Sequence, residues 1–153
     1  MFSLFRKKAQ DFFSKEEKDR IVAAIKAAEM KTSGEIRVYM ESHCRFVDPV
    51  DRAIEIFYGL NMKETAQRNG VLVYIALKDH QLAIYGDEGI HQKVGEPFWN
   101  EEVKHILSEC NASHFVEGIT LVIKEIGEAL QFHFPYDRDS DQNELPDEIV
   151  FGR

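Results

Sequence analysis

The sequence predicts an α/β protein, folded as a three-layer α/β/α sandwich in which helices cover both faces of a small mixed sheet. Three observations predict this class. The run Val71–Leu77 is apolar throughout, which is typical of a strand buried on both faces. Segments 35–41 and 82–85 also have strand patterns. Apolar residues recur at helical spacing between strands 35–41 and 71–77 and again after strand 82–85. This order is that of a β-α-β unit followed by further helices.

Length and composition fit one soluble domain. We assign residues 13–135 to the domain, residues 1–12 to an N-terminal extension and residues 136–153 to an acidic C-terminal tail. The net charge of −8 argues against nucleic-acid binding, and no apolar run approaches the ~20 residues of a membrane span. Cys44 and Cys110 lack metal-type spacing and a secretory signal is absent, so we expect a cytoplasmic protein with free thiols.

The first helix and the first strand have clear boundaries. Ser14 and Glu17 form a capping box, which predicts a helix from about Lys15 to Met30. Its apolar stripe consists of Ile21, Val22, Ile25 and Ala28. The sequence Thr32–Gly34 ends it. Residues 35–41 then alternate in character, with Ile36, Val38 and Met40 on one face of a strand.

A second helix connects this strand to the apolar run. Asp48 is its expected N-cap and Pro49 its first residue. Residues 59–67 form a polar connection. The four residues between Val71–Leu77 and the strand 82–85 predict a hairpin, so the third strand runs antiparallel to the second.

The remaining chain is predicted to be mainly helical. A short helical turn is expected over residues 90–94, and a longer helix begins at Pro97. A further helix starts at Phe115 and ends near Phe134, with an apolar stripe along its length. Within the acidic tail, residues 148–152 have the composition of a short edge strand.

This topology brings three distant turns together. The β-α-β crossover makes strands 35–41 and 71–77 parallel, so both begin at the edge where the antiparallel strand 82–85 ends. Segments 32–35, 68–70 and 86–91 should therefore converge, each with a glycine. Open parallel sheets usually bind ligands at the opposite edge, which is the alternative location. That alternative rests on Glu41, Ser42, His43, Lys78 and Asp79.

The same segments carry a family resemblance. The words TSGEIRV (32–38), RNGVLVY (68–74) and IYGDEGIH (84–91), with FSKEE (13–17) before them, resemble the TPM domain family, also called the TPM phosphatase domain. The resemblance covers roughly residues 13–134. It implies an α/β/α fold, binding of calcium or another divalent cation, and a phosphatase label that does not hold for every member. Many members carry a signal peptide or a membrane segment, which this sequence lacks.

Four oxygen-bearing side chains at the predicted edge are candidate ligands for a divalent metal, Ca²⁺ or Mg²⁺. They are Glu35, Asn69, Asp87 and Glu88. Structural roles are the alternatives: Asp87 can cap the helix that follows it, Glu35 can pair with Arg68, and Glu88 can be solvated. The residues alone leave these alternatives open.

Asp87, His91 and Arg68 are the candidate catalytic residues, His91 as a general acid or metal ligand and Arg68 as a phosphate-binding group. No phosphatase nucleophile motif, phosphate-binding loop or nucleophile elbow occurs in the sequence. Three functions follow as hypotheses. The first is a soluble, divalent-cation-binding TPM-type module with a regulatory role. The second is a weak metal-assisted phosphomonoesterase. The third is a scaffold for an unknown protein partner, bound through the tail or the N-terminus.

Overall fold

The fold is taken from a computed structural model that describes residues 8–109, 114–136 and 148–152. Its elements, in chain order, are η2 (Ala9–Asp11), α1 (Lys15–Glu29), β1 (Glu35–Glu41), α2 (Pro49–Gly59), η3 (Met62–Glu64), β2 (Gly70–Ala76), β3 (Gln81–Gly86), α3 (Glu88–Val94), α4 (Glu96–Glu109), α5 (Phe115–His133) and β4 (Ile149–Phe151). Cys110, the first seven residues and most of the acidic tail lie outside the described residues.

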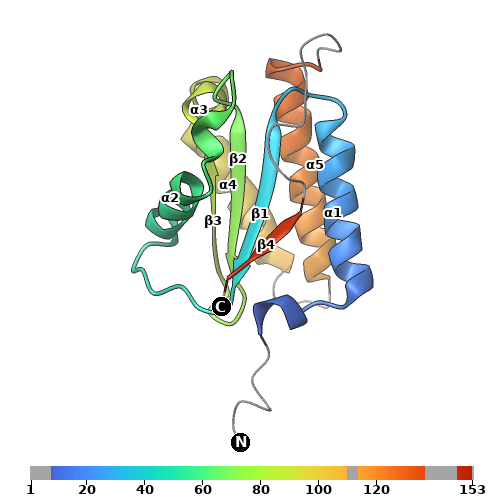
Figure 1. Cartoon of the computed structure of the whole chain (residues 1–153), viewed down its shortest axis with the longest axis vertical. Helices are drawn as coiled ribbons and strands as arrows, with labels where there is room; N and C mark the ends of the chain where they lie inside the picture. Colours follow the sequence, from blue (N-terminus) through green and yellow to red (C-terminus); the bar gives the residue numbers. More distant parts are fainter. Residues whose placement is uncertain (1–7, 110–113, 137–147, 153) are drawn as a thin grey trace, which may run out of the picture.

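The four strands form one mixed sheet in the order β3-β2-β1-β4 (Figure 1). β1 and β2 are parallel and pair from Glu35 beside Gly70 to Glu41 beside Ala76. β2 and β3 are antiparallel, and β4 joins β1 in parallel at the other side. The predicted β-α-β unit, the hairpin and the edge strand in the tail are therefore confirmed.

Helices lie on both faces of the sheet, which confirms the three-layer α/β/α architecture. α1, α4 and α5 cover one face and α2 covers the other (Figure 1). All seven residues of β2 are buried, because the strand lies in the middle of the sheet between both helical layers. Val71, Val73 and Ile75 join the larger core under α1, α4 and α5. Leu72 and Tyr74 join the smaller core under α2.

Two helices begin as their sequences predict. The Ser14 hydroxyl accepts the backbone N–H of Glu17 at 3.1 Å, and the Glu17 carboxylate accepts that of Ser14 at 2.9 Å. Asp48 accepts the backbone N–H of Val50 at 2.9 Å, with Pro49 in the first turn of α2. Each cap satisfies donors that the first turn of a helix leaves without an intrahelical acceptor.

Two short 3₁₀ helices were not predicted. η3 lies inside the supposed polar connection and fully buries Met62 against the smaller core. η2 brings Ala9 into the larger core, although residue 9 belongs to the supposed N-terminal extension. One apolar residue in a polar stretch shows no period, so the sequence pattern gives no sign that it is buried.

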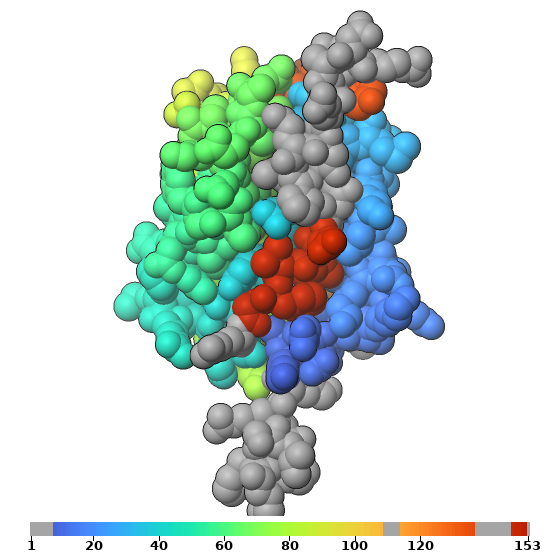
Figure 2. All heavy atoms as spheres, viewed as in Figure 1, coloured from blue at the N-terminus to red at the C-terminus, as the bar shows by residue number. Residues whose placement is uncertain are grey.

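β4 lies on the surface as the edge strand of the sheet, between β1 and α1 (Figure 2). All three of its residues are partly buried, and the Lys18 ammonium of α1 lies 5.7 Å from the centre of the Phe151 ring. None of the described helices combines the length and the apolar character that a membrane crossing requires.

Candidate functional site

The three predicted turns meet at the end of the sheet where β1 and β2 begin, near α3 in Figure 1. The backbone N–H of Glu35 donates to the carbonyl of Asn69 at 3.3 Å, and that of Asp87 donates to the carbonyl of Gly70 at 2.9 Å. Gly89 N–H donates to the Arg68 carbonyl at 2.8 Å. Backbone hydrogen bonds therefore join all three segments.

Glu35 and Asp87 occupy one row across the sheet, with Gly70 between them. Glu35 pairs with Gly70, and the β2–β3 register extended by one residue places Asp87 opposite Gly70. Residues in one row of a sheet point to the same face. Both carboxylates are buried, with 3% exposure for Glu35 and 1% for Asp87. Gly70 contributes no side chain between them.

Asp87 is held by two kinds of donor. The Arg68 guanidinium donates to its two oxygens from Nε at 2.7 Å and from Nη2 at 2.8 Å, a bidentate geometry. The backbone N–H of Glu88 donates to Oδ1 at 2.8 Å, so Asp87 also caps α3 as one alternative predicted. The hydrogen bonds to Asp87 raise the pKa of Arg68 above its ordinary value.

The Arg68 turn depends on a close backbone approach. Arg68 has φ +53°, in the left-handed region that side chains other than glycine and asparagine rarely adopt. A Cβ atom on Gly89 would lie 2.1 Å from the Gln67 carbonyl oxygen and 2.6 Å from that of Arg68. Only glycine lets α3 begin this close to the turn before β2.

Asn69 is 1% exposed, and only one of the two polar groups of its side chain has a hydrogen-bond partner among the described residues. Its side-chain amide donates to the Ser33 hydroxyl at 3.3 Å, and its backbone N–H donates to the Thr65 hydroxyl at 3.1 Å. Its side-chain oxygen Oδ1 is buried and has no hydrogen-bond partner among the described residues. A buried acceptor in this state is uncommon and costs free energy, about 1–3 kcal/mol.

A pocket of about 370 Å³ opens beside the Arg68–Asp87 pair. Arg68, Asp87, Glu88 and His91 all contribute to its walls. The Trp99 indole N–H donates to His91 Nδ1 at 3.0 Å. Because an indole only donates, His91 Nδ1 must accept, so the proton of the neutral imidazole is on Nε2.

The pocket wall offers no evident nucleophile. No serine, threonine or cysteine is among its lining residues. Burial, and then the neighbouring Tyr58, raise the pKa of Tyr85 to about 12, so this phenol keeps its proton at neutral pH. The charged side chains of the wall are Arg68, Asp87, Glu88 and Glu96, and His91 lies among them.

The structure separates the predicted site residues into two sets. Arg68, Asp87, Glu88 and His91 surround the pocket, whereas Glu35 and Asn69 are buried at the same end of the sheet without lining it. Arg68 pairs with Asp87 and, through Nη1 at 3.2 Å, with the exposed Glu88. The alternative Glu35–Arg68 pair is not formed among these described side chains.

Sequence reasoning missed several members of the pocket wall, among them Trp99 and Tyr85. Trp99 is a core residue, as expected, but its indole also fixes the His91 ring. Tyr85 packs edge-on against Phe57 at 4.9 Å between ring centres. Side chains of a strand point alternately to its two faces, and this alternation along β3 could have placed Tyr85 on the face toward α2. No sequence pattern connects His91 to Trp99.

The opposite end of the sheet holds the alternative set. Glu41 accepts from Arg52 Nε and Nη2, both at 2.9 Å, and from the hydroxyl of the fully buried Tyr74. Burial opposes ionisation of Glu41, but these hydrogen bonds outweigh it and lower its pKa. Asp79 accepts from His43 at 2.8 Å and from the Cys44 backbone at 2.7 Å. A pocket of about 530 Å³ lies beside Glu41 and Arg52.

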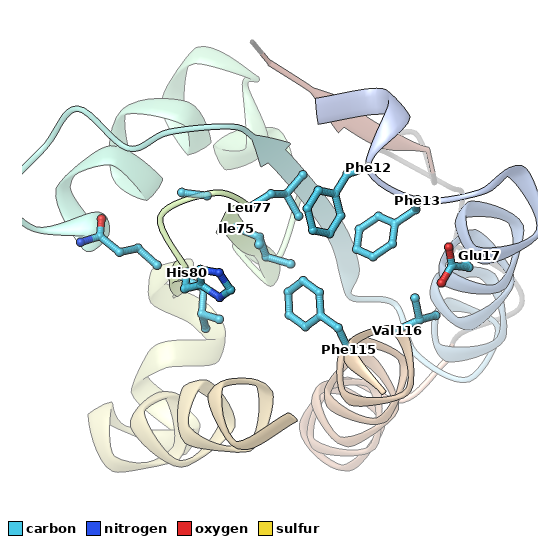
Figure 3. A pocket seen from close by; sticks show the side chains of 11 residues that line it. Phe12, Phe13, Glu17, Ile75, Leu77, His80, Phe115 and Val116 are labelled. Carbon is cyan, nitrogen blue, oxygen red and sulfur yellow. The ribbon is translucent and has the colours of Figure 1, made fainter. Parts of the chain in front are cut away.

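A third pocket, of about 220 Å³, is mainly apolar and lies where α1 and α5 begin. The rings of Phe12, Phe13 and Phe115 gather around it (Figure 3). Glu17 and His80 are its titratable residues. Its lining suits an apolar group and offers little to a cation.

Comparison with known proteins supports the similarity seen in the sequence. The model of the TPM domain family matches residues 7–129. The chain is 40% identical to the BA42 protein of the psychrophilic bacterium Bizionia argentinensis, over 92% of this chain and 96% of that one, with a TM-score of 0.83. The N-terminal domain of cg2496 from Corynebacterium glutamicum shares the fold at 16% identity, over 78% and 74% of the chains, with a TM-score of 0.58. No curated protein gives a significant match.

Proposed function

The chain belongs to the TPM domain family, and we propose that it is a divalent-cation-binding module with its site at the end of the sheet where β1 and β2 begin. The proposed ion is Ca²⁺ or Mg²⁺. Glu35, Asn69, Asp87 and Glu88 are the proposed side-chain ligands, with backbone carbonyls and water completing the shell. We propose a regulatory or binding role for this module.

One observation carries the proposal: the buried Asn69 Oδ1 has no hydrogen-bond partner among the described residues. It lies at the same end as two buried carboxylates. Carboxylate and amide oxygens are the donors that Ca²⁺ and Mg²⁺ prefer. A bound cation would satisfy Asn69 Oδ1.

Arg68 competes with such an ion for Asp87. Its guanidinium already takes both Asp87 oxygens. The Arg68 side chain is 35% exposed, so it can turn toward solvent and keep Glu88 as a partner. Binding would then replace the Arg68 guanidinium by the metal ion at Asp87. The affinity for the ion should therefore depend on which residue occupies position 68.

A calcium titration followed by backbone amide shifts tests the site. The informative variant is Asp87→Asn, because asparagine also caps helices while it removes the charge and one of the two oxygens. We expect calcium to shift amides of residues 32–35, 69–70 and 86–91 in the wild type. Affinity should fall about tenfold or more in Asp87→Asn, which corresponds to ~1.4 kcal/mol.

Two further variants sharpen this test. Asp79→Asn makes the same chemical change at the opposite end of the sheet and should leave calcium affinity unchanged. Arg68→Gln removes the competing guanidinium and should raise it. Calcium shifts absent from the three segments at millimolar concentration, or equal losses in Asp87→Asn and Asp79→Asn, would contradict the proposal.

A weak metal-assisted phosphomonoesterase is the second candidate. The observation favouring it is that Arg68, Asp87 and His91 line one pocket. Arg68 would bind a phosphate oxygen, and His91 would donate its Nε2 proton to the leaving oxygen as the P–O bond breaks. A bound metal would supply an activated water for this hydrolysis. Hydrolysis of p-nitrophenyl phosphate, with Mg²⁺ and with a chelator, measures this activity. A rate that is equal in the wild type and Asp87→Asn would assign it to a contaminant or another site.

A further inference from the structure

Two helices on the other layer bring together a second group of possible ligands. Glu102 and His105 lie three residues apart on α4, a spacing that places both on one face of the helix. Glu125 faces them from α5, which packs beside α4. One ligand atom from each of the three residues lies within 4.8 Å of the others. None of the three lines the pocket of Arg68 and His91.

We propose that Glu102, His105 and Glu125 form a binding site for a divalent transition-metal ion of the Zn²⁺ class, separate from the calcium or magnesium site. The ion would take one oxygen from each carboxylate and Nδ1 of the imidazole. Water from the exposed side of the pair of helices would supply the fourth ligand.

The two distances that involve His105 are close to those of tetrahedral zinc. His105 Nδ1 lies 3.3 Å from Glu125 Oε1 and 3.8 Å from Glu102 Oε2. Zinc bonds of about 2.0–2.1 Å at tetrahedral angles separate neighbouring ligand atoms by about 3.3 Å. The first pair already has this separation. The second needs a change of about half an ångström, which carboxylate rotation provides.

Glu102 supplies an observation independent of the cluster. It is 4% exposed, and its Oε2, the atom nearest His105, is buried without a hydrogen-bond partner among the described residues. A buried polar oxygen without a donor costs free energy. A cation between the three groups removes this penalty.

The donor set selects the ion. Ca²⁺ takes six to eight oxygen ligands, whereas three side chains with one imidazole nitrogen suit a four-coordinate ion. Imidazole favours zinc and its neighbours in the first transition series over Ca²⁺ and Mg²⁺. His105 is 46% exposed and Glu125 is 30% exposed, so an ion can reach the site from solvent.

Calorimetric titration of the chelator-treated full chain with ZnCl₂ tests the proposal. We expect one zinc ion per chain in the wild type and at least about tenfold weaker binding in His105→Ala and in Glu125→Gln. His114→Ala is the matched control. His114 Nδ1 lies 3.9 Å from Oε2 of Glu117, a glutamate three residues further along the chain, and His114 does not belong to the proposed zinc site. The control should change zinc affinity less than twofold.

A second measurement locates the ion even if one variant folds poorly. Mn²⁺ added to the wild type should broaden amide signals of residues 102–105 and 125 through its unpaired electrons. Asp87→Asn should keep both zinc binding and this broadening, which separates this site from the calcium proposal. No zinc binding by the wild type, or zinc affinity within twofold of wild type in His105→Ala, would overturn the proposal, as would broadening confined to residues 68–70 and 86–91.

Discussion

Each end of the central sheet holds a buried carboxylate that accepts two hydrogen bonds from an arginine: Glu41 from Arg52 at one end and Asp87 from Arg68 at the other. The two carboxylates differ in the donor of their third hydrogen bond. Glu41 takes it from the hydroxyl of Tyr74, a fully buried core residue. Asp87 takes it from the first turn of α3, beside the exposed Glu88. At the Glu41 end the third donor is a buried side chain, whereas at the Asp87 end it is a backbone N–H. The Asp87 end also holds the buried Asn69 Oδ1, which lacks a hydrogen-bond partner among the described residues. The two ion pairs therefore share a bidentate geometry, and the proposed ion site lies beside only one of them.

Breaking the backbone contact behind the Asp87 end should have the largest effect. In Gly89→Ala the new Cβ would meet the Gln67 carbonyl oxygen at 2.1 Å, and backbone cannot move aside cheaply. We expect a loss of more than about 3 kcal/mol in the free energy of unfolding, measured in urea. Gly59→Ala is the control, because nothing lies within 4 Å of its Cβ. It should gain about 0.5–1 kcal/mol from helix propensity.

Removing the arginine at each end should distinguish the two ends. Arg52→Met leaves Glu41 buried beside Tyr74 alone, and we expect a loss of about 3 kcal/mol that calcium does not restore. Arg68→Met should also lose stability in chelator. Calcium should restore part of that loss, because an ion that binds only the folded state stabilises it. Thermal unfolding with and without calcium measures the stability of both variants. An equal gain of stability from calcium in Arg52→Met and Arg68→Met would contradict the difference between the two ends.

The lowered pKa of Glu41 predicts a pH-dependent contribution to stability. Its folded pKa lies below the ordinary 4.5, so the stabilisation is present above pH 4.5 and is lost as pH falls through the folded value. Glu41→Gln should be about 1–2 kcal/mol less stable than wild type at pH 7, and the gap should narrow below pH 4.5. Glu55→Gln is the control at pH 7: its 56% exposed carboxylate also pairs with Arg52, and its loss should cost less than about 0.5 kcal/mol. If the difference in the free energy of unfolding between wild type and Glu41→Gln instead grew in acid, the pKa of Glu41 would be raised rather than lowered.

The exposed ion pair near Glu41 should matter least. His43 pairs with Asp79 at 2.8 Å, but its side chain is 62% exposed. We expect His43→Ala to change the free energy of unfolding by less than about 0.5 kcal/mol, because solvent screens such pairs. Asp79 retains the Cys44 backbone N–H as a donor. Urea unfolding at neutral pH measures the change, and a loss comparable to that of Arg52→Met would mean that His43 has a packing role.

Local patterns were enough to predict most of the fold. Capping signals placed the starts of α1 and α2, and continuous apolar character placed β2 in the middle of the sheet. The handedness rule then made β1 and β2 parallel, which predicted the convergence of three distant turns. These features depend on neighbours in the chain or on a general rule of chain direction, so a single sequence contains them.

The tertiary structure alone decided which groups bind which. The sequence grouped Glu35, Arg68 and Asp87, but it could not tell that Arg68 would pair with Asp87 rather than Glu35. It gave no sign that Trp99 would hold His91, or that Glu102 would be buried against α5. Such partners lie far apart in the chain or on different helices, and their pairing depends on side-chain distances of a few ångströms. Sequence periodicity predicts the face on which a residue lies, whereas packing decides its partner.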